Sequence, residues 1–339
     1  MRRRSVGLVA TVDRADRQSR MSRRGWLSAG AMALFAGWGS SLRAQLGKKS
    51  ALSADDERTV AGIREHAKKV GLGNFEVKST EHFLAVGDAP RAYSAEALNL
   101  CESYAKEFLE HFRRLGFQLD YPAHRMTLVL LKDAATFQTF AEEGAKGVGG
   151  HYDLASNRLV IFDMRPEQAE LKAQGSDAER VNTFTLVHET AHMLCYNSGL
   201  LPTGRDIPVA IDEGLATYCE YWTPHRGPSP FGRLNEQRLG DLEKLLDDGK
   251  PWIPIATLLR DDRVFSDPKT EHLAYAESGL LVRYLIRQPA MLVKLQTYLA
   301  GLPKDRARRE AHATSIFGPL QNLDQETRGY VRQVQKRRR

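Results

Sequence analysis

The most informative stretch of the sequence is Val187-His188-Glu189-Thr190-Ala191-His192-Met193, because it places two histidines four residues apart. Residues four apart on an α-helix lie on one face, one turn from each other. His188 and His192 can therefore each direct a ring nitrogen at a single ion. The neighbouring residues are largely apolar, which predicts a mostly buried helix. Burying two histidines and a glutamate without partners would be costly, so the stretch predicts a metal site.

The third metal ligand is expected in the segment Pro208–Tyr218, which contains Glu213, 21 residues after His192. The intervening residues allow a loop followed by a second helix that runs back past the first. Neutral imidazoles suit zinc, and a catalytic zinc takes three protein ligands and keeps one open position. We therefore predict Zn²⁺ held by His188, His192 and Glu213. Glu189 would serve as the general base that takes a proton from water.

Taken together, the HExxH motif and Glu-Gly-Leu-Ala-Thr-Tyr at 213–218 resemble the gluzincins. The chain is most similar to the peptidase-MA-like group of uncharacterised bacterial proteins, over about Met126 to Leu285. The resemblance implies a zincin-like catalytic unit and a zinc metallopeptidase acting on a peptide or protein substrate. Thermolysin-like enzymes place an aspartate four residues after the ligand glutamate to orient a histidine, where this chain has Thr217. Glu220 and Asp212 are the alternatives for that role.

The resemblance also implies a donor that stabilises a developing oxyanion, supplied by a later helix. We expect Tyr275 in this role, with His272 in reserve. The other interpretation of Tyr275 is a core tyrosine with a satisfied hydroxyl group. Similarly, residues 149–152 predict either an edge strand that pairs with a peptide or an ordinary hairpin strand.

The remaining periodicity predicts an α+β fold with a small, mostly antiparallel sheet and a helical C-terminal part. Strands are expected at 75–79, 82–86, 126–131, 150–154 and 158–162, and long helices at 54–70, 94–115, 178–196, 208–222, 233–248, 270–287, 289–300, 305–317 and 323–335. Ser94 is the expected N-cap of the second helix. The predicted organisation is an N-terminal α/β segment at 45–125, a catalytic core at 126–300, and C-terminal helices with a basic tail at 301–339.

Residues 1–44 resemble a twin-arginine export signal, with Arg23-Arg24 before a short apolar run from Trp26 to Trp38, a polar stretch, and Ala44 at the possible cleavage site. This predicts a periplasmic or otherwise exported protein with no stable membrane span after signal removal; an uncleaved N-terminal anchor is the alternative. Nine arginines and two aspartates give this segment the whole net charge of +7. The rest of the chain is nearly neutral, which argues against a nucleic-acid partner.

Two further alternatives remain open in the sequence. Cys195 and Cys219 could pair in a disulfide or remain buried thiols, and Cys101 would then be the third free cysteine or the only one. A non-catalytic envelope binding protein on a gluzincin-like scaffold is the alternative function, although it would have no need of Glu189. His111 and His225 are expected to be surface residues.

Overall fold

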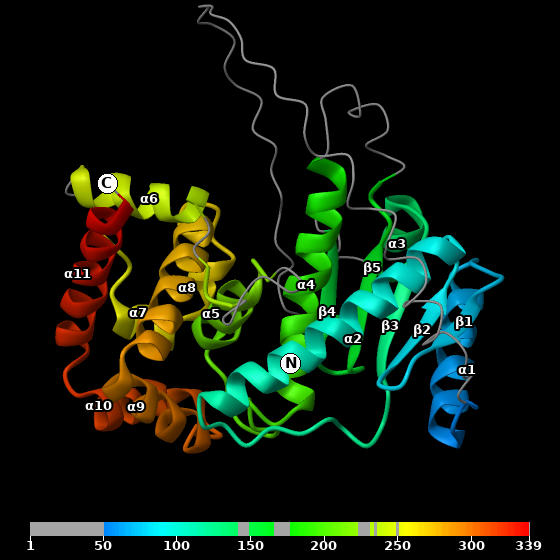
Figure 1. Cartoon of the computed structure of the whole chain (residues 1–339), viewed down its shortest axis with the longest axis horizontal. Coiled ribbons are helices and arrows are strands. Elements are labelled where there is room, and N and C mark those ends of the chain that lie inside the picture. Colours follow the sequence, from blue (N-terminus) through cyan, green and yellow to red (C-terminus); the bar gives the residue numbers. More distant parts are fainter. Residues whose placement is uncertain are drawn as a thin grey trace, which may run out of the picture.

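The computed structural model describes residues 51–141, 149–165, 177–222, 231–233, 236–248 and 251–338. The predicted export signal and His225 lie outside these described residues. A mixed five-stranded sheet occupies one side of the molecule, a group of helices occupies the other, and α4 stands between them (Figure 1). This arrangement confirms the α+β class. Within the described part of the chain, no helix combines the length and apolar character that a membrane span requires.

The sheet has the strand order β1-β2-β3-β5-β4. Its strands are β1 (Glu76–Ser79), β2 (Phe83–Gly87), β3 (Met126–Leu131), β4 (Gly150–Asp153) and β5 (Arg158–Phe162). All six residues of β3 are buried, as expected of a central strand. The strands that precede residue 126 thus join those that follow it in a single sheet.

The prediction of a mostly antiparallel sheet is wrong in one respect. The two hairpins, β1–β2 and β4–β5, are antiparallel as expected, but β3 pairs in parallel with both β2 and β5. The reason is that helix α2 (Arg91–Arg114) lies between β2 and β3, and α3 (Ala134–Ala141) follows β3. A crossover of this length returns the chain to the same end of the sheet and makes the paired strands parallel.

Each face of the sheet is covered by its own helices. Alternate side chains along a strand point to opposite faces, so Leu128 joins the large core with α2 and α4, whereas Val129 joins a smaller core beneath α1 (Ala54–Lys69) and α3. The large core continues from the sheet through α4 into the helical part. It therefore joins the two sides of the molecule.

The helical part begins with α4 and contains seven further α-helices and two short 3-10 helices among the described residues. They are α4 (Asp177–Asn197), α5 (Val209–Cys219), α6 (Glu236–Asp247), α7 (Ile255–Arg260), η3 (Asp262–Phe265), α8 (Glu271–Arg287), α9 (Pro289–Ala300), η4 (Arg306–Arg308), α10 (Arg309–Phe317) and α11 (Leu320–Arg338). The long helices match their expected positions to within a few residues. The short α7 and η3 were not predicted, because six and four residues carry too little periodicity to identify a helix.

The expected N-cap of α2 is also wrong. The helix starts at Arg91 after Pro90, and Ser94 is buried inside its first turn, where its hydroxyl donates a hydrogen bond to the Pro90 carbonyl at 3.2 Å. Proline has the fixed backbone angle that suits a helix start, and it outweighs the serine four residues later.

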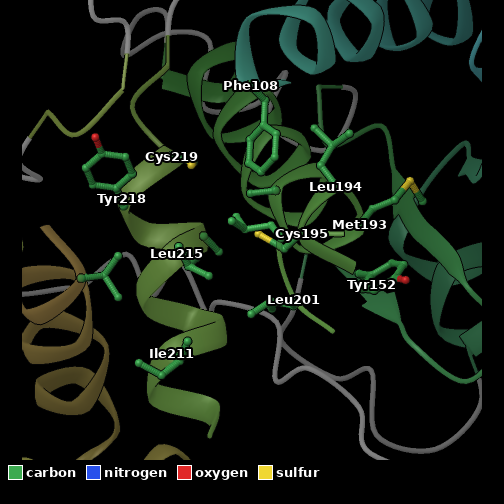
Figure 2. Close-up of a cluster of buried hydrophobic side chains, with 14 of the residues drawn as sticks. Phe108, Tyr152, Met193, Leu194, Cys195, Leu201, Ile211, Leu215, Tyr218 and Cys219 are labelled. Atoms are coloured by element: carbon green, nitrogen blue, oxygen red, sulfur yellow. The ribbon is translucent and has the colours of Figure 1, made fainter. Parts of the chain in front are cut away.

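Helix α5 is packed tightly on both sides. Figure 2 shows Ile211, Leu215 and Cys219 along α5, with Cys195 of α4 in the same buried cluster. On its other side, Gly214 approaches α8 so closely that an added Cβ atom would lie 2.7 Å from the Ser278 carbonyl oxygen. Gly279 of α8 makes the reciprocal approach to Thr217. The distance between α5 and α8 is therefore set by backbone contact.

Candidate metal centre

The two helices α4 and α5 bring His188, His192 and Glu213 together, as predicted. Each of the three side chains is only 1% exposed. His188 and His192 lie one turn apart on α4, and Glu213 faces them from the middle of α5. Because the surrounding residues largely belong to the large apolar core, the three atoms that face one another can be satisfied only by one another or by a ligand held among them.

The three inward-facing atoms form a nearly equilateral triangle. His188 Nε2 lies 3.3 Å from His192 Nε2, and Glu213 Oε2 lies 3.3 Å from the first and 3.4 Å from the second. For comparison, the edge of a tetrahedron around zinc with bonds of about 2.0–2.1 Å is about 3.3–3.4 Å. The residues therefore fit three corners of a tetrahedral site, and the group could hold a metal ion.

The charges around His188, His192 and Glu213 also favour a bound cation. Burial alone would lower the pKa of His188, but the Glu213 and Glu220 carboxylates outweigh it and raise that pKa to about 9. The pKa of His192 is also raised against the effect of burial, chiefly by Asp212 and Glu213. Burial opposes ionisation of Glu213, but the two histidines lower its pKa to about 2. The site thus attracts positive charge, and a metal ion would take the place of protons there.

A carboxylate contacts the Nδ1 atom of His192. His192 Nδ1 lies 2.7 Å from Asp212 Oδ1, and the Tyr196 hydroxyl donates to the other oxygen of Asp212 at 2.9 Å. A carboxylate on Nδ1 favours the tautomer that leaves Nε2 free as a ligand. Asp212, one of the two alternatives raised by the sequence, therefore serves as the orienting group for this histidine.

His188 has a longer contact of the same kind. Its Nδ1 lies 3.5 Å from Glu220 Oε2, and Arg238 Nη2 of α6 lies 3.4 Å from the same oxygen. Thr217, which stands at the position expected for an orienting aspartate, instead turns towards Gly279 of α8. The role that the sequence left open is thus divided between Asp212 and Glu220, one carboxylate for each histidine.

Glu189 is 1% exposed and lies beside the metal ligands. Its Oε2 accepts a hydrogen bond of 2.8 Å from the backbone N–H of Tyr152 in β4. Burial raises the pKa of Glu189, which the neighbouring histidines partly offset. A glutamate with a raised pKa next to a metal site is suited to accept a proton and give it back.

Tyr275 is 3% exposed and lies on α8, the helix that packs against the ligand helix α5. Burial raises its pKa well above the ordinary value, and the charges of Glu213 and Glu189 raise it further. The Tyr275 hydroxyl is therefore within electrostatic range of the metal centre. The reserve residue, His272, is exposed in the first turn of α8.

The other sequence predictions have mixed outcomes. All three cysteines, Cys101, Cys195 and Cys219, are buried free thiols. The prediction for His111 is wrong: it is 7% exposed and makes a 3.0 Å hydrogen bond with the Tyr218 hydroxyl. Burial lowers the pKa of His111 to about 4. Its place in the amphipathic pattern of α2 gave a signal for burial, because Phe108 and Tyr104, three and seven residues earlier, are also buried.

Sequence reasoning missed three contributors to the site. The Tyr152 backbone holds Glu189, Tyr196 supports Asp212, and Arg238 supports Glu220. Only Tyr196 carried a usable signal, since it lies one turn after His192 on the same helix. The backbone amide of Tyr152 cannot be recognised from residue type, and Arg238 reaches the site from a helix 18 residues beyond Glu220.

A family described as a protein of unknown function, DUF1570, matches residues 182–300. The matched region begins within α4 and ends with α9, so it contains all three residues of the metal centre and Tyr275. A comparison with curated proteins found no match.

Proposed function

We propose that the protein is a zinc-dependent hydrolase, a peptidase of the gluzincin type. The observation that carries the proposal is the buried triangle of His188, His192 and Glu213, with Glu189 beside it. When bound, zinc supplies Lewis acidity, which polarises a carbonyl group and acidifies water. Two imidazoles and one carboxylate with an open fourth position form the ligand set of catalytic zinc sites.

In this proposal, the protein's own groups carry the proton. Glu189, held in place by the Tyr152 amide, takes a proton from the attacking water and later passes it to the leaving amine. Tyr275 would donate a hydrogen bond to the oxyanion that forms on the substrate carbonyl. Asp212 and Glu220 keep the two histidines oriented as ligands.

The choice of a peptide as substrate rests on the resemblance to gluzincins, and the edge strand β4 supports it. The N–H of Tyr152 points towards Glu189 of α4, so this edge of the sheet faces the metal centre. A peptide that adds to β4 would gain main-chain hydrogen bonds while its own carbonyl groups lie next to the site. Export through the twin-arginine route, which carries folded proteins, is part of the same proposal and would deliver the protein with its metal already bound.

The first test is the metal content of the purified full chain beside a Glu213→Ala variant. We expect about one zinc ion per chain in the wild type and little in the variant, because two remaining ligands do not complete the site. Added zinc should also raise the melting temperature of the wild type alone. A wild type that binds no stoichiometric metal, even after reconstitution, would contradict the proposal.

The second test separates an enzyme from a binding protein. Glu189→Gln should keep the metal and lose hydrolysis of a peptide library by roughly a hundredfold or more. Tyr275→Phe should keep the metal and lose less, because it removes a single hydrogen bond. A metal-loaded wild type that hydrolyses no peptide at all would favour the non-catalytic alternative.

A further inference from the structure

A small cavity lies where α5, α6 and α8 meet, and three arginines line it: Arg233, Arg238 and Arg283. Its volume is about 30 Å³, which is room for about two water molecules or a group of similar size. Arg233 is exposed and marks the mouth, whereas Arg238 is 7% exposed. A cavity this small that gathers three guanidinium groups is a place where an anion would be stabilised.

The positive charge of the cavity is only partly balanced by the described residues. Arg238 contacts Glu220 at 3.4 Å. Arg283 has two buried atoms, Nε and Nη1, that make no hydrogen bond with any described group. Burial lowers the pKa of Arg283, and the nearby charge of Arg287 lowers it further. The Tyr330 side chain also interacts with Arg283, so the cost falls on the two donors that lack an acceptor, and an anion would remove it.

A third donor faces the same space. The Thr217 hydroxyl lines the cavity and is buried without a hydrogen-bond partner among the described residues. The remaining wall is largely apolar and includes Leu239, Leu242 and Leu280. Two guanidinium N–H groups and a hydroxyl match the acceptor oxygens of a carboxylate, which guanidinium groups bind with two parallel hydrogen bonds. A carboxylate also matches the small volume.

Helix α5 carries both Thr217 of the cavity and Glu213 of the candidate metal centre. Thr217 lies one helical turn after Glu213 on α5, which is a rise of about 6 Å. Arg238 extends from the cavity to the site itself, since its guanidinium also lies over the Tyr275 ring at 5.4 Å.

We propose that this cavity binds a carboxylate group of the substrate. The carboxylate is either the free C-terminus of a peptide or an acidic side chain. The binding site itself does not depend on the metal, whereas its assignment to the substrate rests on the proposed hydrolase function. The two parts therefore need separate measurements.

Carboxylate binding is tested with ¹³C-labelled acetate titrated into the metal-free full chain and followed by NMR. Saturable binding is expected, weakened roughly tenfold or more in Arg283→Gln, because hydrogen bonds to a charged group are lost. Ala276→Leu, which fills the cavity from α8 without changing a charge, should weaken binding similarly. Arg287→Gln, one turn further along α8, is the control and should bind as the wild type does. The site is overturned if the wild type shows no saturable binding, or if both cavity variants match it.

The assignment to the substrate is tested with matched peptides on the zinc-loaded enzyme. Each peptide is made with a free or an amidated C-terminus, and with an internal Glu or Gln. The carboxylate form that binds the cavity should show a KM roughly tenfold lower, and Arg283→Gln should remove that difference while leaving the neutral peptide unaffected. Equal KM values for all forms would overturn the assignment. If acetate binds but no peptide is cleaved, the carboxylate site stands and the proposed hydrolase function fails.

Discussion

Two buried polar clusters in the helical part of this protein are built on opposite principles. Around Arg309, which is 0% exposed, the guanidinium group donates to Asp206, Asp262 and the Ile207 carbonyl. Every charge there meets its opposite. In the metal centre, by contrast, two ring nitrogens and a carboxylate oxygen direct their lone pairs at one point. The first cluster is complete within the protein, whereas the second could hold a metal ion.

This difference separates structural from functional buried charge. Asp262 also accepts a hydrogen bond from the Val209 N–H at the start of α5, so the Arg309 cluster fixes the helix that carries Glu213. The Arg309 cluster thus supports the candidate metal centre structurally, although its own residues are not candidate metal ligands. A complementary set of charges needs no ligand, and a convergent set of ligand atoms does.

The largest effect should come from breaking the complementary cluster. Arg309→Met leaves Asp206 and Asp262 buried without their cation and should lower the free energy of unfolding by about 3–5 kcal/mol. Urea denaturation measures this loss, which should be the same with and without added zinc. A change below about 1 kcal/mol would mean that the cluster is not a structural anchor.

A smaller effect should separate the two supports of the metal centre. Asp212→Asn and Glu220→Gln should each weaken zinc affinity by roughly 10- to 100-fold, as the loss of an orienting carboxylate commonly does. The effect should be larger for Asp212, whose contact with His192 is 2.7 Å, than for Glu220, at 3.5 Å from His188. Competition with a zinc chelator gives both affinities, and the reverse order would show that these distances do not rank the supports.

The last effect depends on pH and concerns Glu277, whose carboxyl group accepts a hydrogen bond from the Ile253 N–H at 3.0 Å. Burial raises the pKa of Glu277 to about 8. Since the folded pKa is raised above the unfolded value, the protonated side chain favours folding at low pH, and this contribution is lost as the pH rises towards 8. Glu277→Gln should therefore be more stable than the wild type at pH 8 and equally stable at pH 4. Parallel pH profiles for the two proteins would rule out this titration.

The sequence allowed the metal ligands to be predicted because their spacing is local. A histidine pair four residues apart defines a helix face, and Glu213 follows within one loop and one helix. The parallel pairing of β3 could not be seen in any single strand, because it depends on where α2 delivers the chain. The contact between Arg238 and Glu220 depends on how α6 crosses α5, which no local pattern records.

The glycine contact between α5 and α8 has a consequence for how the site can evolve. Because Gly214 meets the Ser278 carbonyl with no side chain between them, even one methyl group there would push α5 away from α8 and carry the neighbouring Glu213 with it. The ligand triangle tolerates only a few tenths of an ångström. We therefore expect substitutions at Gly214 to be poorly tolerated during evolution, although this residue is not one of the three candidate ligands. The geometry of the candidate metal centre depends on a helix contact that leaves no room for a side chain.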